Sequence, residues 1–158
     1  MEKQRLNRVL AEGIGSLFFI GKILPFFQGT VASIIGCIIY LFIVKNNLIF
    51  LLFVITLLII GFPTSELAEH FSGKKDPKEI IIDDLSGMCI SLLFIPQQLK
   101  YVFIGFVIFR MLDAFKIPPA DYLEDFKGSI GIMGDDIIAG IYTNIILHIG
   151  IYLSKITL

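Results

Sequence analysis

The feature that most restricts how this chain can fold is its division into five strongly apolar blocks. These blocks cover residues 31–44, 48–62, 88–96, 101–109 and 137–153. Each is shorter than the roughly 20 residues that a perpendicular helix needs to cross the hydrocarbon core of a bilayer, but its flanks can extend it into the interface. A chain of 158 residues is too short to bury five such blocks in a soluble core. We therefore predict an all-α fold, an integral membrane helical bundle of about five hydrophobic helices, over the alternative of a very apolar soluble helical core.

Composition and charge support this class. Hydrophobic residues make up 56% of the chain and charged residues 17%, whereas about a quarter of a typical soluble domain is charged. The net charge of −1 gives no overall positive field that would attract nucleic acid. The sequence contains no evident internal repeat or low-complexity tract, so residues 1–158 are predicted to form a single domain.

The charged residues fall unequally on the two ends of the apolar blocks. All but three of the 13 lysines and arginines, and all 14 acidic residues, lie on one side. The exceptions are Lys45, Lys100 and Lys155. By the positive-inside rule, the side rich in lysine and arginine faces the cytoplasm. Acidic residues contribute little to orientation, so their clustering there indicates a functional site on the cytoplasmic face.

Local signals predict where the first helices begin. Residues 4–27 are expected to form an amphipathic helix followed by a loop. Thr30 is the expected N-cap of the next helix. A polar turn at residues 45–47 then makes the first two apolar blocks an antiparallel helical hairpin.

A stronger start signal precedes the third block. Asp76, Pro77 and Glu79 match a capping box with proline at the first helical position. The third helix is therefore expected to run from Pro77 to about residue 96.

The last block follows a pair of adjacent acids, Asp135 and Asp136. The fourth helix should end near Pro118, because proline disfavours helix in the residue before it. Residues 120–134 should then form a cytoplasmic loop, and the fifth helix should begin at the aspartate pair. Helix capping explains at most one of the two aspartates, because only one residue can be the N-cap and its neighbour points about 100° around the helix. The other is left for a different role.

Two further charged groups lie at the same depth. Asp83 and Asp84 form a second adjacent pair at the cytoplasmic end of an apolar helix, while Arg110, Asp113 and Lys116 share one helix face. For these last three, an ion pair within the helix and a lysine that reaches the interface is the structural alternative. Two carboxylates about 5 Å apart repel by roughly 3 kcal/mol at an effective dielectric constant of about 20. A divalent cation would neutralise them, and an all-oxygen site suits Mg²⁺ rather than zinc.

Groups that can bind phosphate lie on the same side. Gly29 and Thr30 begin a helix whose first N–H groups and positive dipole end favour an anion, and Lys22 lies shortly before them. Together with a carboxylate-bound cation, these are the parts of phosphoryl chemistry. Their depth indicates a lipid substrate whose head lies at the interface. The alternative is a small ion-coupled membrane transporter that uses the acidic cluster, although an ion path favours acids spread across the bilayer and here every acid lies at one end.

Three motifs, in this order and spacing, resemble the phosphatidylglycerophosphatase A family over about residues 13–153. The first is Gly21, Leu24-Pro25 and Gly29-Thr30-Val31-Ala32-Ser33. The second is Lys75-Asp76-Pro77, Glu79, Asp83-Asp84 and Gly87. The third is Phe109-Arg110, Asp113, Lys116 and Pro118, followed by Gly131-Ile132-Met133-Gly134-Asp135-Asp136 and Ala139-Gly140. The chain departs from the family pattern at Phe27-Gln28, where the family has Ala-Pro, and at Asp84, where it has Glu.

The resemblance implies a hydrolase of phospholipid biosynthesis, a Mg²⁺-dependent lipid phosphatase that converts phosphatidylglycerophosphate to phosphatidylglycerol and phosphate. It also implies a multi-pass protein of the bacterial inner (cytoplasmic) membrane whose active site faces the cytoplasm. The implied metal ligands are Asp83, Asp84, Asp113, Asp135 and Asp136, of which Asp84, Asp113 and Asp136 are the expected catalytic residues. The substrate phosphate is expected to contact Lys22, Gly29, Thr30, Arg110 and Lys116. The number of metal ions, the nucleophile and the oligomeric state stay open.

Overall fold

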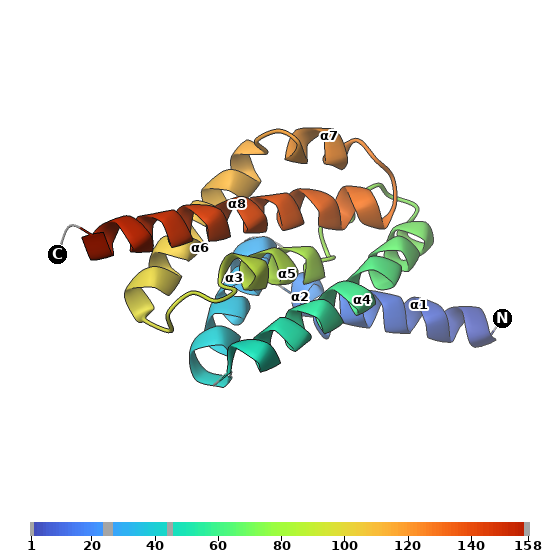
Figure 1. The fold of residues 1–158 in the computed structure, drawn as a ribbon. Helices are drawn as coiled ribbons and strands as arrows, with labels where there is room; N and C mark the ends of the chain where they lie inside the picture. The colour runs from blue at the N-terminus through green and yellow to red at the C-terminus, as the bar shows by residue number, and fades with distance from the viewer. Residues whose placement is uncertain (1, 24–26, 44–45, 157–158) are drawn as a thin grey trace.

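The computed structural model describes residues 2–23, 27–43 and 46–156, and every regular element within them is a helix (Figure 1). In chain order these elements are α1 (Glu2–Gly15), α2 (Ile20–Ile23), α3 (Gln28–Ile38), the π-helical turn η1 (Ile39–Ile43), α4 (Asn47–Ser72), α5 (Ile82–Ser91), α6 (Leu99–Phe115), α7 (Ala120–Glu124) and α8 (Ser129–Ile156). The prediction of an all-α fold is confirmed for the described part of the chain.

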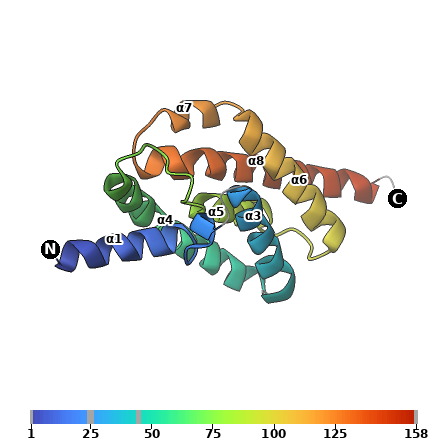
Figure 2. The same cartoon turned by 180° about the vertical axis from the view of Figure 1, so that it is seen from behind.

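The short helix α5 lies at the centre of the fold. It packs most extensively against α8, then against α3, and it also contacts α4 and α6 (Figures 1 and 2). Helix α1 packs on α4, while α6 and α7 pack on α8. The end of α4 and the start of α8 lie together on the right of Figure 1.

A hydrophobic core holds α5 in place. Its largest fully buried side chains include Tyr40, Phe50, Met88, Leu92 and Phe109. These side chains come from η1, α4, α5 and α6 and from the residue that follows α5, so burying them together fixes α5 between its neighbours. Near the turn that precedes α4, the ring centroids of Tyr40 and Phe50 lie 4.8 Å apart.

Two glycines let α5 and α8 approach closely. A Cβ atom added to Gly140 would lie 2.5 Å from the backbone oxygen of Gly87, and one added to Gly87 would lie 2.6 Å from the backbone oxygen of Asp136. Neither distance leaves room for a side chain, so both positions require glycine. The close contact brings the first half of α8, with Asp136, directly against α5.

Two helices, α4 and α8, are long and apolar enough to cross a membrane, as judged by length and composition. Only 28% of the most apolar window of each helix is buried within the protein, whereas the core helix of a soluble protein is mostly buried. The sequence predicts five hydrophobic helices, but within the described part of the chain only α4 and α8 are long enough to span a membrane, because α3, α5 and α6 are shorter.

The predicted start of the third helix is wrong. The helix α5 begins at Ile82 rather than Pro77 and ends at Ser91 rather than near residue 96. Before it, Ile80 and Ile81 are buried, and the Ile81 N–H donates to the Gly15 backbone oxygen at 2.9 Å. Contacts with α1 therefore override the local capping pattern, and the segment between α4 and α5 stays non-helical.

The predicted start of the last helix is also wrong. The helix α8 begins at Ser129, so neither Asp135 nor Asp136 is its N-cap. The expected loop over residues 120–134 is shorter than predicted, because it contains α7 as well as the first turns of α8. Both aspartates lie inside α8, which leaves both side chains available for other contacts.

Two expectations for the first half of the chain also need correction. Thr30 lies inside α3, which begins at Gln28 after Phe27 in the left-handed conformation (φ 65°). The Gln28 side chain donates to the Gly21 backbone oxygen at 2.6 Å and so ties down this earlier start. The two helices of the predicted hairpin do not pack along each other, because α3 packs chiefly against α5. The second of them, α4, continues through Pro63 to Ser72.

Candidate active site

The charged residues singled out in the sequence line a single cavity of about 440 Å³. Its walls come from the start of α3, the segment before α5, and helices α5, α6 and α8. The lining residues are Phe27, Gln28, Gly29, Thr30, Asp76, Lys78, Ile80, Asp83, Asp84, Arg110, Asp113, Lys116, Ile132, Asp135 and Asp136. All of the predicted site residues except Lys22 are in this set. Lys22 belongs to α2, but its side chain lies outside the described part, as do residues 24 and 25 of the first motif.

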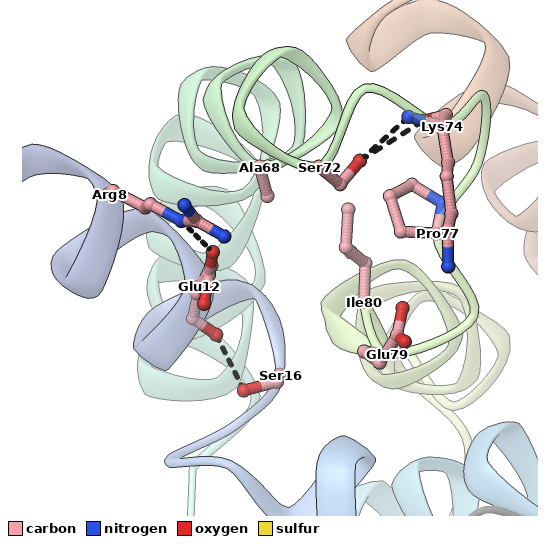
Figure 3. Close-up of a pocket in the computed structure, with 9 residues that line it drawn as sticks. All are labelled: Arg8, Glu12, Ser16, Ala68, Ser72, Lys74, Pro77, Glu79 and Ile80. Atoms are coloured by element: carbon pink, nitrogen blue, oxygen red, sulfur yellow. Dashed lines mark hydrogen bonds and ion pairs between the residues drawn. The ribbon is translucent and has the colours of Figure 1, made fainter.

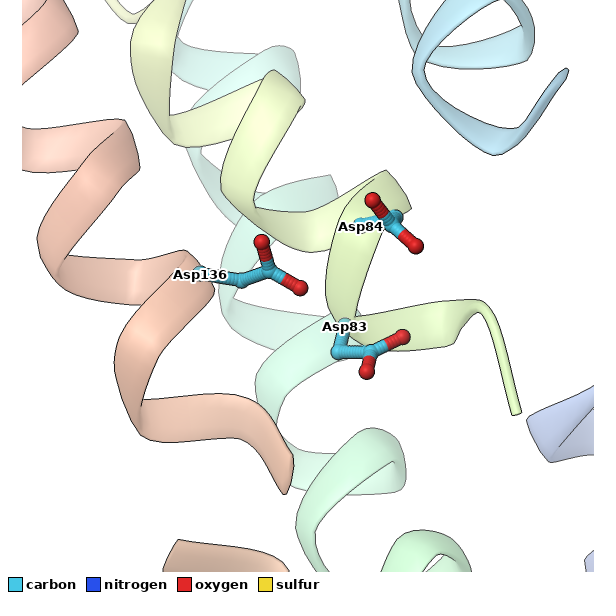
Figure 4. A group of neighbouring side chains, drawn as sticks. All are labelled: Asp83, Asp84 and Asp136. Atoms are coloured by element: carbon cyan, nitrogen blue, oxygen red, sulfur yellow. The ribbon is translucent and has the colours of Figure 1, made fainter. Parts of the chain in front are cut away.

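Three aspartates face one another across the contact between α5 and α8. Asp83 and Asp84 lie in the first turn of α5, and Asp136 projects toward them from α8 (Figure 4). One carboxylate oxygen from each residue lies within 4.8 Å of the other two. Asp83 and Asp136 are buried, with 7% and 4% of their surface exposed.

Two of these carboxylates have oxygen atoms without a partner. Among the described residues, Oδ1 of Asp83 and Oδ1 of Asp136 are buried and accept no hydrogen bond. Burying a carboxylate without a donor is costly, and buried charges in proteins are normally paired or bound to a metal ion. A divalent cation between the three side chains would satisfy both atoms, and hard oxygen ligands suit Mg²⁺, Ca²⁺ or Mn²⁺. The trio can therefore hold a metal ion.

The environment of α5 disfavours negative charge at this point. Burial raises the pKa of Asp84 to about 6, although the Arg110 guanidinium opposes this shift. Burial, reinforced by the neighbouring Asp84 charge, raises the pKa of Asp83 well above its usual value. Loss of solvent around both carboxylates therefore disfavours their ionised forms.

The other two predicted ligands contact cations instead. Nη1 of Arg110 lies 2.9 Å from Oδ2 of Asp113 and also forms an ion pair with Asp84. Nζ of Lys116 donates to Oδ2 of Asp135 at 2.9 Å. Arg110 and Lys116 have 29% of their side chains exposed, so both remain accessible from the cavity while a carboxylate orients each of them.

Helix α3 meets the acidic cluster at its first turn. A Cβ atom added to Gly29 would lie 2.3 Å from Oδ2 of Asp84, so the backbone of α3 lies directly against this carboxylate. The hydroxyl of Ser33 donates to the Gly29 backbone oxygen at 2.9 Å. Because Gln28, Gly29 and Thr30 line the cavity, the positive end of the α3 dipole is close to the site.

Sequence reasoning missed three polar residues of this cavity, namely Gln28, Asp76 and Lys78. Asp76 was interpreted as a helix cap, but it has a positive φ of 45° and lies in the segment before α5. Its sequence position could have identified it. Asp76 lies directly before a proline, has lysines on both sides, and falls on the same side of the apolar blocks as the other acids.

A second, smaller pocket of about 220 Å³ lies on the other side of Ile80, which lines both cavities. It is formed by α1, the end of α4 and the segment that follows (Figure 3). Nε of Arg8 pairs with Glu12 at 2.7 Å, and Ser16 donates to the Glu12 backbone oxygen. Two cations, Arg8 and Lys74, face two carboxylates there, so this pocket has no excess charge comparable to that of the first.

Comparison with known proteins identifies related sequences. The family model described as "Phosphatidylglycerophosphatase A" matches residues 13–151. The chain is 30% identical to phosphatidylglycerophosphatase A of Haemophilus influenzae over 143 residues, which cover 88% of this chain and 85% of that protein. It is 40% identical to phosphatidylglycerophosphatase A of Escherichia coli K12 over 78 residues, 48% of this chain and 45% of the relative.

A further relative carries a different name. The chain is 35% identical over 78 residues to a Bacteroides thetaiotaomicron protein provisionally named phosphatidylinositol-3-phosphatase, covering 48% of this chain and 49% of that protein. The matched segment thus spans about half the length of this relative and of the Escherichia coli relative. No solved structure matches the chain.

Proposed function

Because this chain belongs to the phosphatidylglycerophosphatase A family, we propose that it hydrolyses phosphatidylglycerophosphate to phosphatidylglycerol and inorganic phosphate. The observation that carries the proposal is that three carboxylates lie together beside Arg110 and Lys116 in one cavity. Two of these carboxylates each have a buried oxygen that accepts no hydrogen bond from the described residues. An acidic cluster that can hold a cation, next to accessible basic side chains, suits a phosphate monoester.

Asp83, Asp84 and Asp136 would hold the cation, which we propose to be Mg²⁺. When bound there, Mg²⁺ would supply positive charge to the phosphoryl oxygens of the substrate. Arg110 would bind the terminal phosphate through the guanidinium N–H groups that remain beside its carboxylate pairs, because arginine has five donors. Asp113 would orient Arg110, and Asp135 would orient Lys116, through their ion pairs.

The first turn of α3 would complete the phosphate site. The helix start at Gln28, Gly29 and Thr30 lines the cavity, and its positive dipole end stabilises an anion. Lys22 would add a further cation from α2. Water would add to phosphorus, and the bond from phosphorus to the glycerol oxygen would break. One proton of that water would pass to the leaving oxygen, which gives the hydroxyl group of phosphatidylglycerol, and the other would stay on the released phosphate.

The proposed setting is the cytoplasmic face of a bacterial inner membrane, with residues 1–158 acting as a single multi-pass domain. The apolar, mostly exposed helices α4 and α8 support a membrane location, and the excess of lysine and arginine on one side supports the orientation. Acyl chains in the bilayer would then hold the phosphate at the level of the site. Nothing favours the alternative of an ion-coupled transporter.

A phosphate-release assay on the purified protein in detergent micelles tests this function. We expect Mg²⁺-supported release from phosphatidylglycerophosphate and much lower catalytic efficiency on phosphatidate, phosphatidylinositol 3-phosphate and soluble glycerol 3-phosphate. Comparable efficiency on glycerol 3-phosphate would refute a lipid-specific site. Preference for phosphatidylinositol 3-phosphate would assign a different lipid substrate to the same cavity.

A further inference from the structure

The start of α8 is capped by side chains that belong to another helix. The Ser129 N–H donates to Oε2 of Glu66 at 2.8 Å, and the Gly128 N–H donates to Oε2 of Glu69. Glu66 and Glu69 are three residues apart in the last turns of α4, so they share one face of that helix. Since the first N–H groups of a helix have no partner within it, these carboxylates satisfy donors that usually receive a local cap.

The backbone conformation of Gly128 and its lack of a side chain allow this contact. Its φ is +76°, a conformation that side chains other than glycine rarely adopt. A Cβ atom there would lie 2.4 Å from Oε2 of Glu66. The loop that precedes α8 therefore comes as close to the α4 carboxylates as a backbone can.

The contact bears directly on the cavity, because α8 supplies two of the aspartates that line it. Asp135 and Asp136 follow Ser129 by about two helical turns, roughly 10 Å along the axis. Further along α8, apolar contacts hold the helix, such as Met133 against Gly61 of α4 and Gly140 against Gly87 of α5. Near its C-terminal half, the Asn144 side chain also donates to the backbone oxygens of Ser91 and Leu93. The apolar contacts set how closely the helices approach, whereas hydrogen bonds are directional, and the two carboxylate bonds fix the N-terminal end of α8 along its axis.

We propose that Glu66 and Glu69 are positioning residues that hold α8 at the register where Asp135 and Asp136 reach the cavity. They act through the backbone of α8 and do not touch the substrate. The carboxylates also suit this place electrostatically, since they lie at the positive end of the α8 dipole. The effect on turnover rests on the proposed phosphatase function, whereas the effect on α8 and on cation binding does not.

The direct test compares Glu66→Ala and Glu69→Ala with Glu66→Gln and Glu69→Gln, which keep an acceptor oxygen. Asp125→Ala is the matched control, because it removes an exposed carboxylate near the same loop and leaves the backbone oxygen that accepts from Lys75. Three quantities are measured: amide hydrogen exchange over residues 129–136, Mn²⁺ affinity by electron paramagnetic resonance, and kcat and KM for phosphate release.

We expect the alanine variants to exchange faster at the start of α8, to bind Mn²⁺ several-fold more weakly, and to lose about tenfold or more in kcat. The glutamine variants should recover most of each loss, and Asp125→Ala should match the wild type. A lower melting temperature with unchanged Mn²⁺ affinity and kcat would make both residues merely structural and would overturn the proposal.

Gly128→Ala gives an independent test in case the glutamate variants do not fold. Its control is Gly73→Ala, because Gly73 has a similar φ of +67° but nothing within 4 Å of the added Cβ. Both variants suffer the same backbone strain, and only Gly128→Ala displaces Glu66. Weaker Mn²⁺ binding in Gly128→Ala alone supports the proposal, and equal effects overturn it. If the wild type binds Mn²⁺ but releases no phosphate, the proposed function fails while exchange and Mn²⁺ affinity still decide this inference.

Discussion

Replacing Gly29 by alanine should damage the site without weakening the fold. The new Cβ would lie 2.3 Å from Oδ2 of Asp84, whereas ordinary contacts begin at 3.4 Å. Either α3 or the Asp84 carboxylate must therefore move by about 1 Å, a displacement that can cost about 10²-fold in turnover. Alanine is also a better helix former than glycine by roughly 0.5–1 kcal/mol, which offsets part of the packing cost.

The expected result is a loss of kcat of about 10²-fold with a melting temperature close to that of the wild type. Phosphate release from phosphatidylglycerophosphate and a thermal melt measure the two quantities on the same preparation. Gly150→Ala is the control, because Gly150 is also helical but has nothing within 4 Å of an added Cβ. Turnover of Gly29→Ala within about twofold of this control would show that the close contact with Asp84 does not matter, and the site geometry argued above would be wrong.

Further predictions address the cation and the orientation. Asp136→Asn removes a charge from a residue that does not cap α8. Phosphate release should therefore fall by about two orders of magnitude and require a higher Mg²⁺ concentration. A wild-type Mg²⁺ response would exclude Asp136 as a ligand. Treatment with EDTA should abolish phosphate release and added Mg²⁺ should restore it, whereas EDTA-resistant activity would contradict a metal site. In a background without the native cysteines, a single cysteine at position 46 should react with an impermeant reagent outside the cell, and one at position 125 only after permeabilisation. Equal labelling of both would overturn the orientation.

The residues of the cavity could be predicted because several short-range signals converge on them. Adjacent acids at the end of an apolar block are costly unless they are neutralised, which points to the pairs Asp83-Asp84 and Asp135-Asp136 from the sequence alone. Arg110 and Asp113 were linked by helical spacing, and their side chains do pair at 2.9 Å. These features depend on residues close in sequence, which is why a single sequence carries them.

The helix boundaries could not be predicted, because their causes are distant in sequence. The N-terminal cap of α8 comes from Glu66 and Glu69 on α4 rather than from the aspartates in the chain nearby. The start of α5 is delayed because Ile81 bonds to the backbone of Gly15. In both places a local capping pattern exists, and contacts between helices outweigh it.

The accumulation of acids on one side of the chain then has two separate causes. Glu66 and Glu69 bind backbone N–H groups, so they serve the position of α8. Six further acids, all aspartates, line the cavity, where they outnumber the lysines and arginines by six to three among the described residues. A phosphate monoester carries nearly two negative charges at neutral pH, and this excess would repel it from Arg110 and Lys116. Within the described part, Oδ1 of Asp83 and Oδ1 of Asp136 accept no hydrogen bond, so neutralisation of these two residues has to precede the approach of the lipid phosphate.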